Sequence, residues 1–130
     1  GLDYGCGFAP ALANILKSMG FNVDLYDPFF FPNKGVLLKK YKFITCSEVV
    51  EHFCNPYEEF NKINKLLDNN SWFGVMTTFL TNDDMFPNWY YRRDPTHVVF
   101  FKKKTFQYIG FQRNWQVFFP SENIALFHKK

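Results

Sequence analysis

Apolar positions recur along the first 27 residues with two different periods. Residues 2–4 and 23–27 are short, mostly apolar runs of the kind that forms buried strands, and residues 11–19 carry apolar side chains at helical spacing. Pro10 precedes the helical segment and Gly20 follows it, which is typical of helix ends. The pattern therefore predicts a strand, a glycine turn, a helix and a second strand.

The alternation of strands and helices continues through the rest of the chain. Residues 28–40 are expected to form a loop, and residues 80–101 a long aromatic connection. Further strands are predicted at 43–47 and 72–79, helices at 55–67 and 104–109, a turn at 68–71, and an antiparallel hairpin at 115–119 and 124–128. This order predicts an α/β fold, with a Rossmann-like, doubly wound, mainly parallel sheet and an antiparallel closing strand.

Composition narrows the class of protein. With 130 residues, 47% hydrophobic and 21% charged, the chain is long enough for one folded domain over residues 1–130. A net charge of +3 disfavours a nucleic-acid partner. Three cysteines without a C-x-x-C pair favour a reducing compartment, so we expect a cytoplasmic protein. No apolar run approaches the length of a membrane span. Because the chain begins inside its first strand, we expect an N-terminal segment to be absent.

Two positions suggest a nucleoside cofactor. Gly5 and Gly7 follow the first strand, and the missing Cβ atoms would let backbone amides approach a ligand. Asp27 ends the second strand, where a carboxylate can accept hydrogen bonds from a ribose diol. Pro10 stands where a nicotinamide fingerprint has its third glycine, which disfavours a nicotinamide cofactor.

A second group of polar residues follows the strand at 43–47. Glu48, Glu51 and His52 are spaced to lie on one side of a helical turn. They could bind a divalent ion, for which oxygen donors favour Mg²⁺, or His52 could act as a general base. Alternatively, the two acids simply lie near the positive end of a helix dipole. Asp94 and His97, in the aromatic connection, could contact a substrate or stabilise a turn.

Together these motifs resemble the class I S-adenosylmethionine (SAM)-dependent methyltransferases. The likeness is greatest to small-molecule O-methyltransferases of the ubiquinone-biosynthesis type. The matches are L-D-Y-G-C-G at residues 2–7, Asp27, and F-I-T-C-S-E-V-V-E-H at residues 43–52. The resemblance implies methyl transfer from SAM to a small-molecule acceptor, with catalysis chiefly by in-line alignment.

The resemblance also implies a role for individual residues. Gly5 and Gly7 would lie against the methionine moiety of SAM, and Asp3 would orient the turn. Asp27 would hold the ribose hydroxyls. Cys46 and Ser47 would flank the adenine or the sulfonium. The candidate catalytic residues are His52, His97 and Glu51, and any metal would be held by Glu48, Glu51 and His52.

One departure from the family pattern concerns the third strand. Only 13 residues, 28–40, separate Asp27 from Tyr41, too few for the helix and strand that relatives carry there. We therefore expect the third strand to be missing, with Phe29, Phe30 and Phe31 either capping the adenine edge or filling the core. The alternatives to an active enzyme are a non-catalytic cofactor-binding domain and a nicotinamide-dependent reductase.

Overall fold

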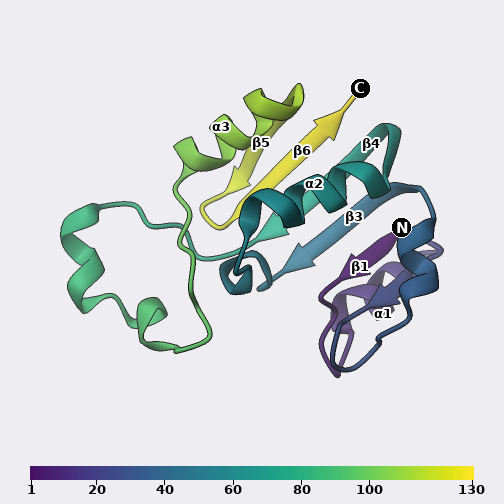
Figure 1. Ribbon diagram of the computed structural model, residues 1–130, viewed down its shortest axis with the longest axis horizontal. Helices are drawn as coiled ribbons and strands as arrows, with labels where there is room; N and C mark the ends of the chain where they lie inside the picture. The colour runs from purple at the N-terminus through teal and green to yellow at the C-terminus, as the bar shows by residue number, and fades with distance from the viewer.

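A computed structural model describes residues 1–130 and contains one six-stranded sheet (Figure 1). The strand order is β2-β1-β3-β4-β6-β5. Strands β1 to β4 are parallel, β6 is antiparallel to β4, and β5 is antiparallel to β6. The predicted fold class is therefore confirmed. The bounds are β1 Leu2–Tyr4, β2 Asp24–Tyr26, β3 Tyr41–Ser47, β4 Leu67–Met76, β5 Trp115–Ser121 and β6 Ile124–Lys129.

Helices cover both faces of the sheet. The connection through α1 and the connection through α2 move along the sheet in opposite directions, so right-handed crossovers place these helices on opposite faces. Figure 1 shows α2 and α3 on the near side of the sheet and α1 behind it. The helices are α1 Ala11–Ser18, α2 Pro56–Leu66 and α3 Lys103–Arg113, with short 3₁₀ turns η1 Lys34–Leu38, η2 Val50–His52, η3 Asp83–Asn88 and η4 Tyr90–Arg93.

The third strand of the usual methyltransferase sheet is missing, as predicted. The chain passes from β2 through η1 directly to β3, and β2 forms the edge of the sheet. Asn33 begins η1, because its side-chain oxygen accepts a hydrogen bond from the Gly35 amide at 3.0 Å. Val36 from this turn is buried in the main core and accepts a hydrogen bond from the Tyr41 hydroxyl at 2.8 Å through its carbonyl.

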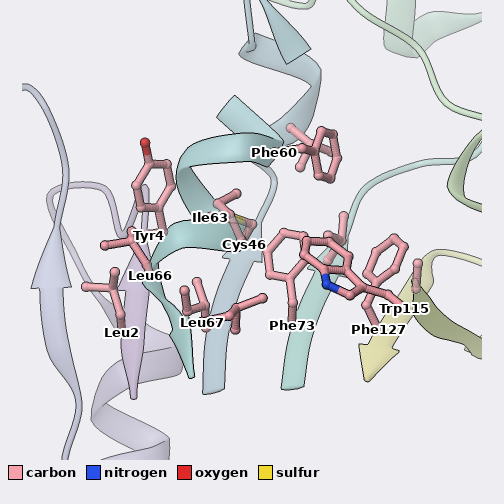
Figure 2. Close-up of a cluster of buried hydrophobic side chains, with 14 of the residues drawn as sticks. Leu2, Tyr4, Cys46, Phe60, Ile63, Leu66, Leu67, Phe73, Trp115 and Phe127 are labelled. Carbon is pink, nitrogen blue, oxygen red and sulfur yellow. The ribbon is translucent and has the colours of Figure 1, made fainter. Parts of the chain in front are cut away.

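The main core lies between the sheet and the helices α2 and α3. Figure 2 shows its side chains converging from both layers. Phe73 on β4 and Phe127 on β6 stack with their ring centres 5.5 Å apart. Phe101 stacks on Phe106 of α3 at 4.9 Å. Much of the aromatic content of the chain therefore serves packing in the core.

Two elements, β4 and α3, differ from their predicted bounds by more than two residues. Strand β4 begins at Leu67, where a turn was expected at 68–71, and it ends at Met76, before the expected Phe79. Pairing between β3 and β4 is irregular at this early part of β4. Helix α3 continues past Ile109 because Gly110 fits against β5, where a Cβ would lie 2.2 Å from a methyl carbon of Val117.

The segment 80–101 projects from the body of the molecule and is drawn in green in Figure 1. It has a small core of its own, in which Leu80, Trp89 and Tyr91 are buried and pack with Phe86 and Phe100. The segment returns to the body where the amides of Val98 and Val99 donate to the Glu51 carbonyl, at 2.9 and 3.1 Å. None of the helices is long and apolar enough to span a membrane.

Candidate active site

The glycine turn, residues Gly5–Gly7, lies at the carboxyl ends of β1 and β2. The amides of Gly5 and Cys6 both donate to the Tyr26 carbonyl, at 2.7 and 3.2 Å. The Gly7 amide donates to the Asp27 carboxylate at 3.0 Å. All three amides are therefore used inside the protein, whereas the sequence predicted amides directed at a ligand. The turn joins the two strand ends and offers a ligand mainly its carbonyls and Cα atoms.

The two glycines of the turn have different surroundings. Both have a left-handed backbone, with φ of 81° at Gly5 and 65° at Gly7. A Cβ at Gly5 would lie 2.6 Å from a methyl carbon of Val49, so this glycine is required by the approach of the segment after β3. A Cβ at Gly7 would meet nothing within 4 Å. Gly7 is thus the glycine beside which a ligand has room.

Asp27 holds the loop that follows β2. One carboxylate oxygen accepts hydrogen bonds from the amides of Phe29 and Phe30, at 2.9 and 3.1 Å, and the other accepts from Gly7. The side chain is 7% exposed. An ionised carboxylate offers about four acceptor positions, so three are occupied by the backbone. Ribose binding by Asp27 stays a prediction, and it requires the remaining position or a shift of the loop.

Asp3 is buried on β1 and connects three elements. Its carboxylate accepts a hydrogen bond from the Thr45 hydroxyl on β3 at 2.9 Å, and it lies near the backbone of Ala13 in the first turn of α1. Burial raises the pKa of Asp3, and these polar neighbours oppose that rise. These contacts orient the glycine turn relative to α1 and β3.

Cys46 and Ser47 end β3, but their side chains face different surroundings. Cys46 is 1% exposed and its thiol is part of the main core (Figure 2), where burial raises its pKa well above the ordinary value. The thiol is therefore not open to a ligand. Ser47 is half-buried, with its hydroxyl 4.0 Å from the Met76 sulfur. A contact of Ser47 with the cofactor stays a prediction.

Next along the chain is the acid–histidine cluster, defined here as Glu48, Glu51, His52, Tyr91 and His97. Glu51 is 0% exposed and its carboxylate accepts hydrogen bonds from the hydroxyls of Tyr91 and Thr77, at 2.6 and 3.1 Å. The Tyr91 hydroxyl is also 2.8 Å from the Glu48 carboxylate. Burial and the neighbouring Glu51 raise the pKa of Glu48. Tyr91 thus joins the projecting segment to the end of β3.

The two histidines of the cluster are held alike. The Nδ1 atoms of His52 and His97 lie 3.0 and 2.7 Å from the carbonyls of Thr96 and Tyr91. A carbonyl only accepts, so each Nδ1 carries a proton, and Nε2 is the nitrogen of each ring that can present a lone pair. The rings meet edge to face at 4.9 Å. The side chain of His52 is 39% exposed and that of His97 11%, so His52 is the more accessible base.

Comparison with known proteins identifies the family. Residues 1–118 match the family described as "Methyltransferase domain". The chain belongs to this methyltransferase family. It is therefore a SAM-dependent methyltransferase, and the prediction made from its motifs is confirmed. No curated protein matches the chain.

Solved structures show the same fold at low sequence identity. A SAM-dependent methyltransferase from Archaeoglobus fulgidus has a TM-score of 0.70 and 18% identity, with 99% of this chain and 85% of that chain covered. A possible histamine N-methyltransferase from Thermotoga maritima has a TM-score of 0.61 and 12% identity, covering 99% and 81%. The plantazolicin methyltransferase BpumL, in complex with S-adenosylhomocysteine (SAH), has a TM-score of 0.63 and 17% identity, covering 99% and 75%.

The possible metal ligands of the methyltransferase differ from the predicted set. Glu51, His52 and His97 have ligand atoms within 4.8 Å of one another, and Glu48 is not among them. Two imidazoles and one carboxylate do not suit Mg²⁺, which prefers oxygen ligands. The carboxylate of Glu51 is moreover already engaged by Tyr91 and Thr77. The prediction of Mg²⁺ is not supported.

Two residues that contact the acid–histidine cluster were not predicted from the sequence. Neither Tyr91 nor Thr77 had a predicted role. Both hydroxyls contact the buried Glu51 carboxylate. A polar Thr77 directly after an apolar strand was the one available signal, since strand ends in parallel sheets carry site residues.

Proposed function

We propose that this methyltransferase transfers the methyl group of SAM to a small-molecule acceptor that loses a proton from oxygen or nitrogen. The observation that carries the proposal is the accessible His52 ring, whose Nε2 lone pair is fixed by the bond from Nδ1 to Thr96. The names of structural neighbours support a small acceptor, since one is a possible histamine N-methyltransferase and another belongs to calicheamicin biosynthesis.

The proposed cofactor site lies over the ends of β1, β2 and β3. The open side of Gly7 would face the methionine moiety, and Asp27 would bind a ribose hydroxyl through its remaining acceptor position. Ser47 would lie beside the adenosyl group. Asp3, Gly5 and Cys46 would act indirectly, because all three are packed against other protein groups.

The proposed chemical step is a direct displacement. The acceptor atom attacks the methyl carbon, the carbon–sulfur bond breaks, and its electron pair stays on sulfur, giving SAH. His52 Nε2 takes the proton that the acceptor loses. Because the methyl donor is already activated as a sulfonium, the remaining requirement is alignment of acceptor, methyl and sulfur in a site that excludes water.

Glu51 and His97 would be positioning residues in this proposal. Glu51 is fully buried, and its carboxylate oxygen lies 4.0 Å from His52 Nε2, so it borders the atom that would take the proton. His97 lies between Tyr91 and His52, in contact with both rings. His97 belongs to the projecting segment, and its ring would hold the His52 ring in position.

The test is methyl transfer from tritiated SAM to a panel of small phenols and amines, with His52→Gln as the variant. His52→Gln should lower kcat by about 10²- to 10⁴-fold and leave the Kd for SAH unchanged. His128→Gln is the matched control, because His128 lies at the other end of the sheet beside Asn70. Binding of SAH without transfer to any acceptor would instead support a non-catalytic domain. Saturable NADH binding without SAH binding would support a reductase.

The location of the protein in the cell is also a proposal. All three cysteines are free, and Cys54 is exposed. Free thiols are typical of proteins in a reducing compartment, which supports the cytoplasm.

A further inference from the structure

A cavity of about 320 Å³ lies between helices α2 and α3, on the face of the sheet that carries the main core. None of the candidate cofactor or catalytic residues lines it. The walls consist largely of aromatic rings, with one cationic side chain: Tyr57, Phe60, Phe100, Phe101, Tyr108 and Arg113.

Arg113 is the unusual member of this lining. Its guanidinium lies 5.6 to 5.9 Å from the centres of three aromatic rings, those of Tyr57, Phe60 and Trp115. Its Nη2 donates to the Asn61 side chain at 2.9 Å and to the Tyr57 carbonyl at 3.4 Å. These acceptors are neutral, and no carboxylate lies within ion-pair distance of the guanidinium. A partly desolvated cation thus has no counter-ion.

Two buried donors beneath the cavity wall also have no acceptor, and one of them belongs to Trp115, which does not line the cavity. They are the Nε of Arg113 and the Nε1 of Trp115, two residues apart at the junction of α3 and β5. A buried donor without an acceptor costs about 1–3 kcal/mol, and proteins rarely leave two together. Burial also lowers the pKa of Arg113, as expected for a cation without a nearby carboxylate. The positive charge and the apolar walls point to a ligand that supplies a negative charge and a flat ring.

We propose that this cavity binds a small aromatic carboxylate, with its carboxylate on the Arg113 guanidinium and its ring among the aromatic walls. A guanidinium attracts a carboxylate by its charge and donates to it through its Nη atoms, whose bonds to the Tyr57 and Ile109 carbonyls are long, at 3.4 and 3.5 Å. The cavity has one cationic side chain, which balances a single negative charge and leaves a doubly charged phosphate half-compensated. Its volume is at the lower end of the range for small-molecule sites.

The ligand of this cavity differs from the methyl acceptor. The cavity is lined by residues of α2, α3 and the segment 99–101, whereas the acid–histidine cluster lies at the carboxyl end of β3. Val99 nevertheless connects the two places. It lines the cavity, and its amide donates a hydrogen bond to the Glu51 carbonyl at 3.1 Å. The cavity is therefore a second binding site of the methyltransferase. It adjoins the projecting segment, residues 80–101, which also contacts the acid–histidine cluster.

Calorimetric titration with 2-naphthoate and with 2-naphthamide tests the proposal, because the two probes share a ring and differ in charge. The naphthoate should bind at least about tenfold more tightly than the amide. Arg113→Met should abolish this difference. Gln112→Glu should weaken naphthoate binding, because Gln112 is exposed, lines the cavity and would place a carboxylate beside Arg113. This second variant keeps the test valid if Arg113→Met does not fold.

Lys104→Met is the matched control, since it removes a positive charge from α3 at an exposed position outside the cavity. It should bind naphthoate like the wild type, and SAH affinity should be unchanged in all three variants. The proposal is overturned if the two probes bind equally, if naphthoate shows no saturable binding, or if Arg113→Met and Gln112→Glu both bind as the wild type does. Amide chemical shifts that move at the glycine turn rather than in α3 would also overturn it.

Discussion

The glycine turn and the acid–histidine cluster lie at neighbouring strand ends, but they are built in opposite ways. The turn is held by backbone amides, which donate to the Tyr26 carbonyl and the Asp27 carboxylate. The cluster is held by side chains from distant segments, with Tyr91 bonded to Glu51 across 40 residues of sequence. A site built on backbone amides tolerates changes of side chain except at its glycines and at Asp27, whose carboxylate accepts from those amides. A side-chain network depends on each of its hydroxyl and carboxyl groups.

The largest expected effect is on stability and separates the two glycines of the turn. Gly5→Ala should lower the free energy of unfolding by about 3 kcal/mol, because the left-handed backbone and the overlap with Val49 both oppose a Cβ. Gly7→Ala should cost only about 1 kcal/mol, since it has the backbone penalty without a clash. Urea unfolding measures both.

The two glycine variants should rank in the opposite order for SAH binding, with Gly7→Ala losing more affinity than Gly5→Ala. The methyl group of Gly7→Ala occupies the open side of the turn, so the folded variant should bind SAH at least about tenfold more weakly. Folded Gly5→Ala should lose less affinity. If Gly7→Ala binds SAH normally, the cofactor does not lie against this glycine.

Tyr91→Phe tests the side-chain network. Removing the hydroxyl leaves the fully buried Glu51 carboxylate with Thr77 as its remaining side-chain donor, and the expected loss of stability is about 2 kcal/mol. The rate of methyl transfer should fall as well, because the projecting segment is no longer joined to the cluster. Tyr90→Phe is the matched control, since Tyr90 is 68% exposed and next to it in sequence. Equal stability of the two variants would contradict a structural role for the Tyr91 hydroxyl.

Asp27→Asn tests the carboxylate that accepts from the glycine turn and from the loop after β2. An amide group cannot accept at both ends, so the variant loses a bond either to the Gly7 amide or to the amides of Phe29 and Phe30. We expect a loss of stability of about 1.5 kcal/mol and a tenfold or greater loss of SAH affinity. Thermal unfolding and calorimetry measure the two effects separately. A stability loss with unchanged SAH affinity would show that Asp27 serves the loop alone.

The same contrast explains what could be predicted from the sequence. Strand and helix positions near the glycine turn follow from local patterns, and the missing third strand follows from the 13 residues between Asp27 and Tyr41. The residues of the turn bond to partners about 20 positions away in a predictable βαβ unit. The orientation of individual groups could not be predicted. The pattern does not show that the amides of the turn donate to other protein groups, or that the Cys46 side chain faces the core.

The acid–histidine cluster was less predictable because the projecting segment has no periodic pattern. Glu48, Glu51 and His52 could be grouped from their spacing, whereas their contacts with Tyr91 and His97 depend on how residues 80–101 fold back. That return is fixed by backbone bonds to the Glu51 carbonyl, which no side-chain pattern reveals. Long loops that carry site residues are therefore where a single sequence is least informative.

The smallest expected effect concerns Glu48, at the exposed edge of the cluster. Its pKa is raised above the ordinary 4.5 by burial and by Glu51, so the folded state binds this proton more tightly than the unfolded state. The contribution to stability is therefore present at pH values below 4.5 and is lost as the pH rises through the raised pKa. Glu48→Gln stays uncharged, so its stability should fall less over this range.

Urea unfolding of the wild type and of Glu48→Gln between pH 4 and pH 8 measures this difference. It should stay below about 1 kcal/mol, because an exposed carboxylate is screened by solvent. Glu122→Gln, in the exposed turn between β5 and β6, should follow the wild-type curve. If Glu48→Gln also runs parallel to the wild type, the contacts of Glu48 in the cluster do not contribute to the pH dependence of stability.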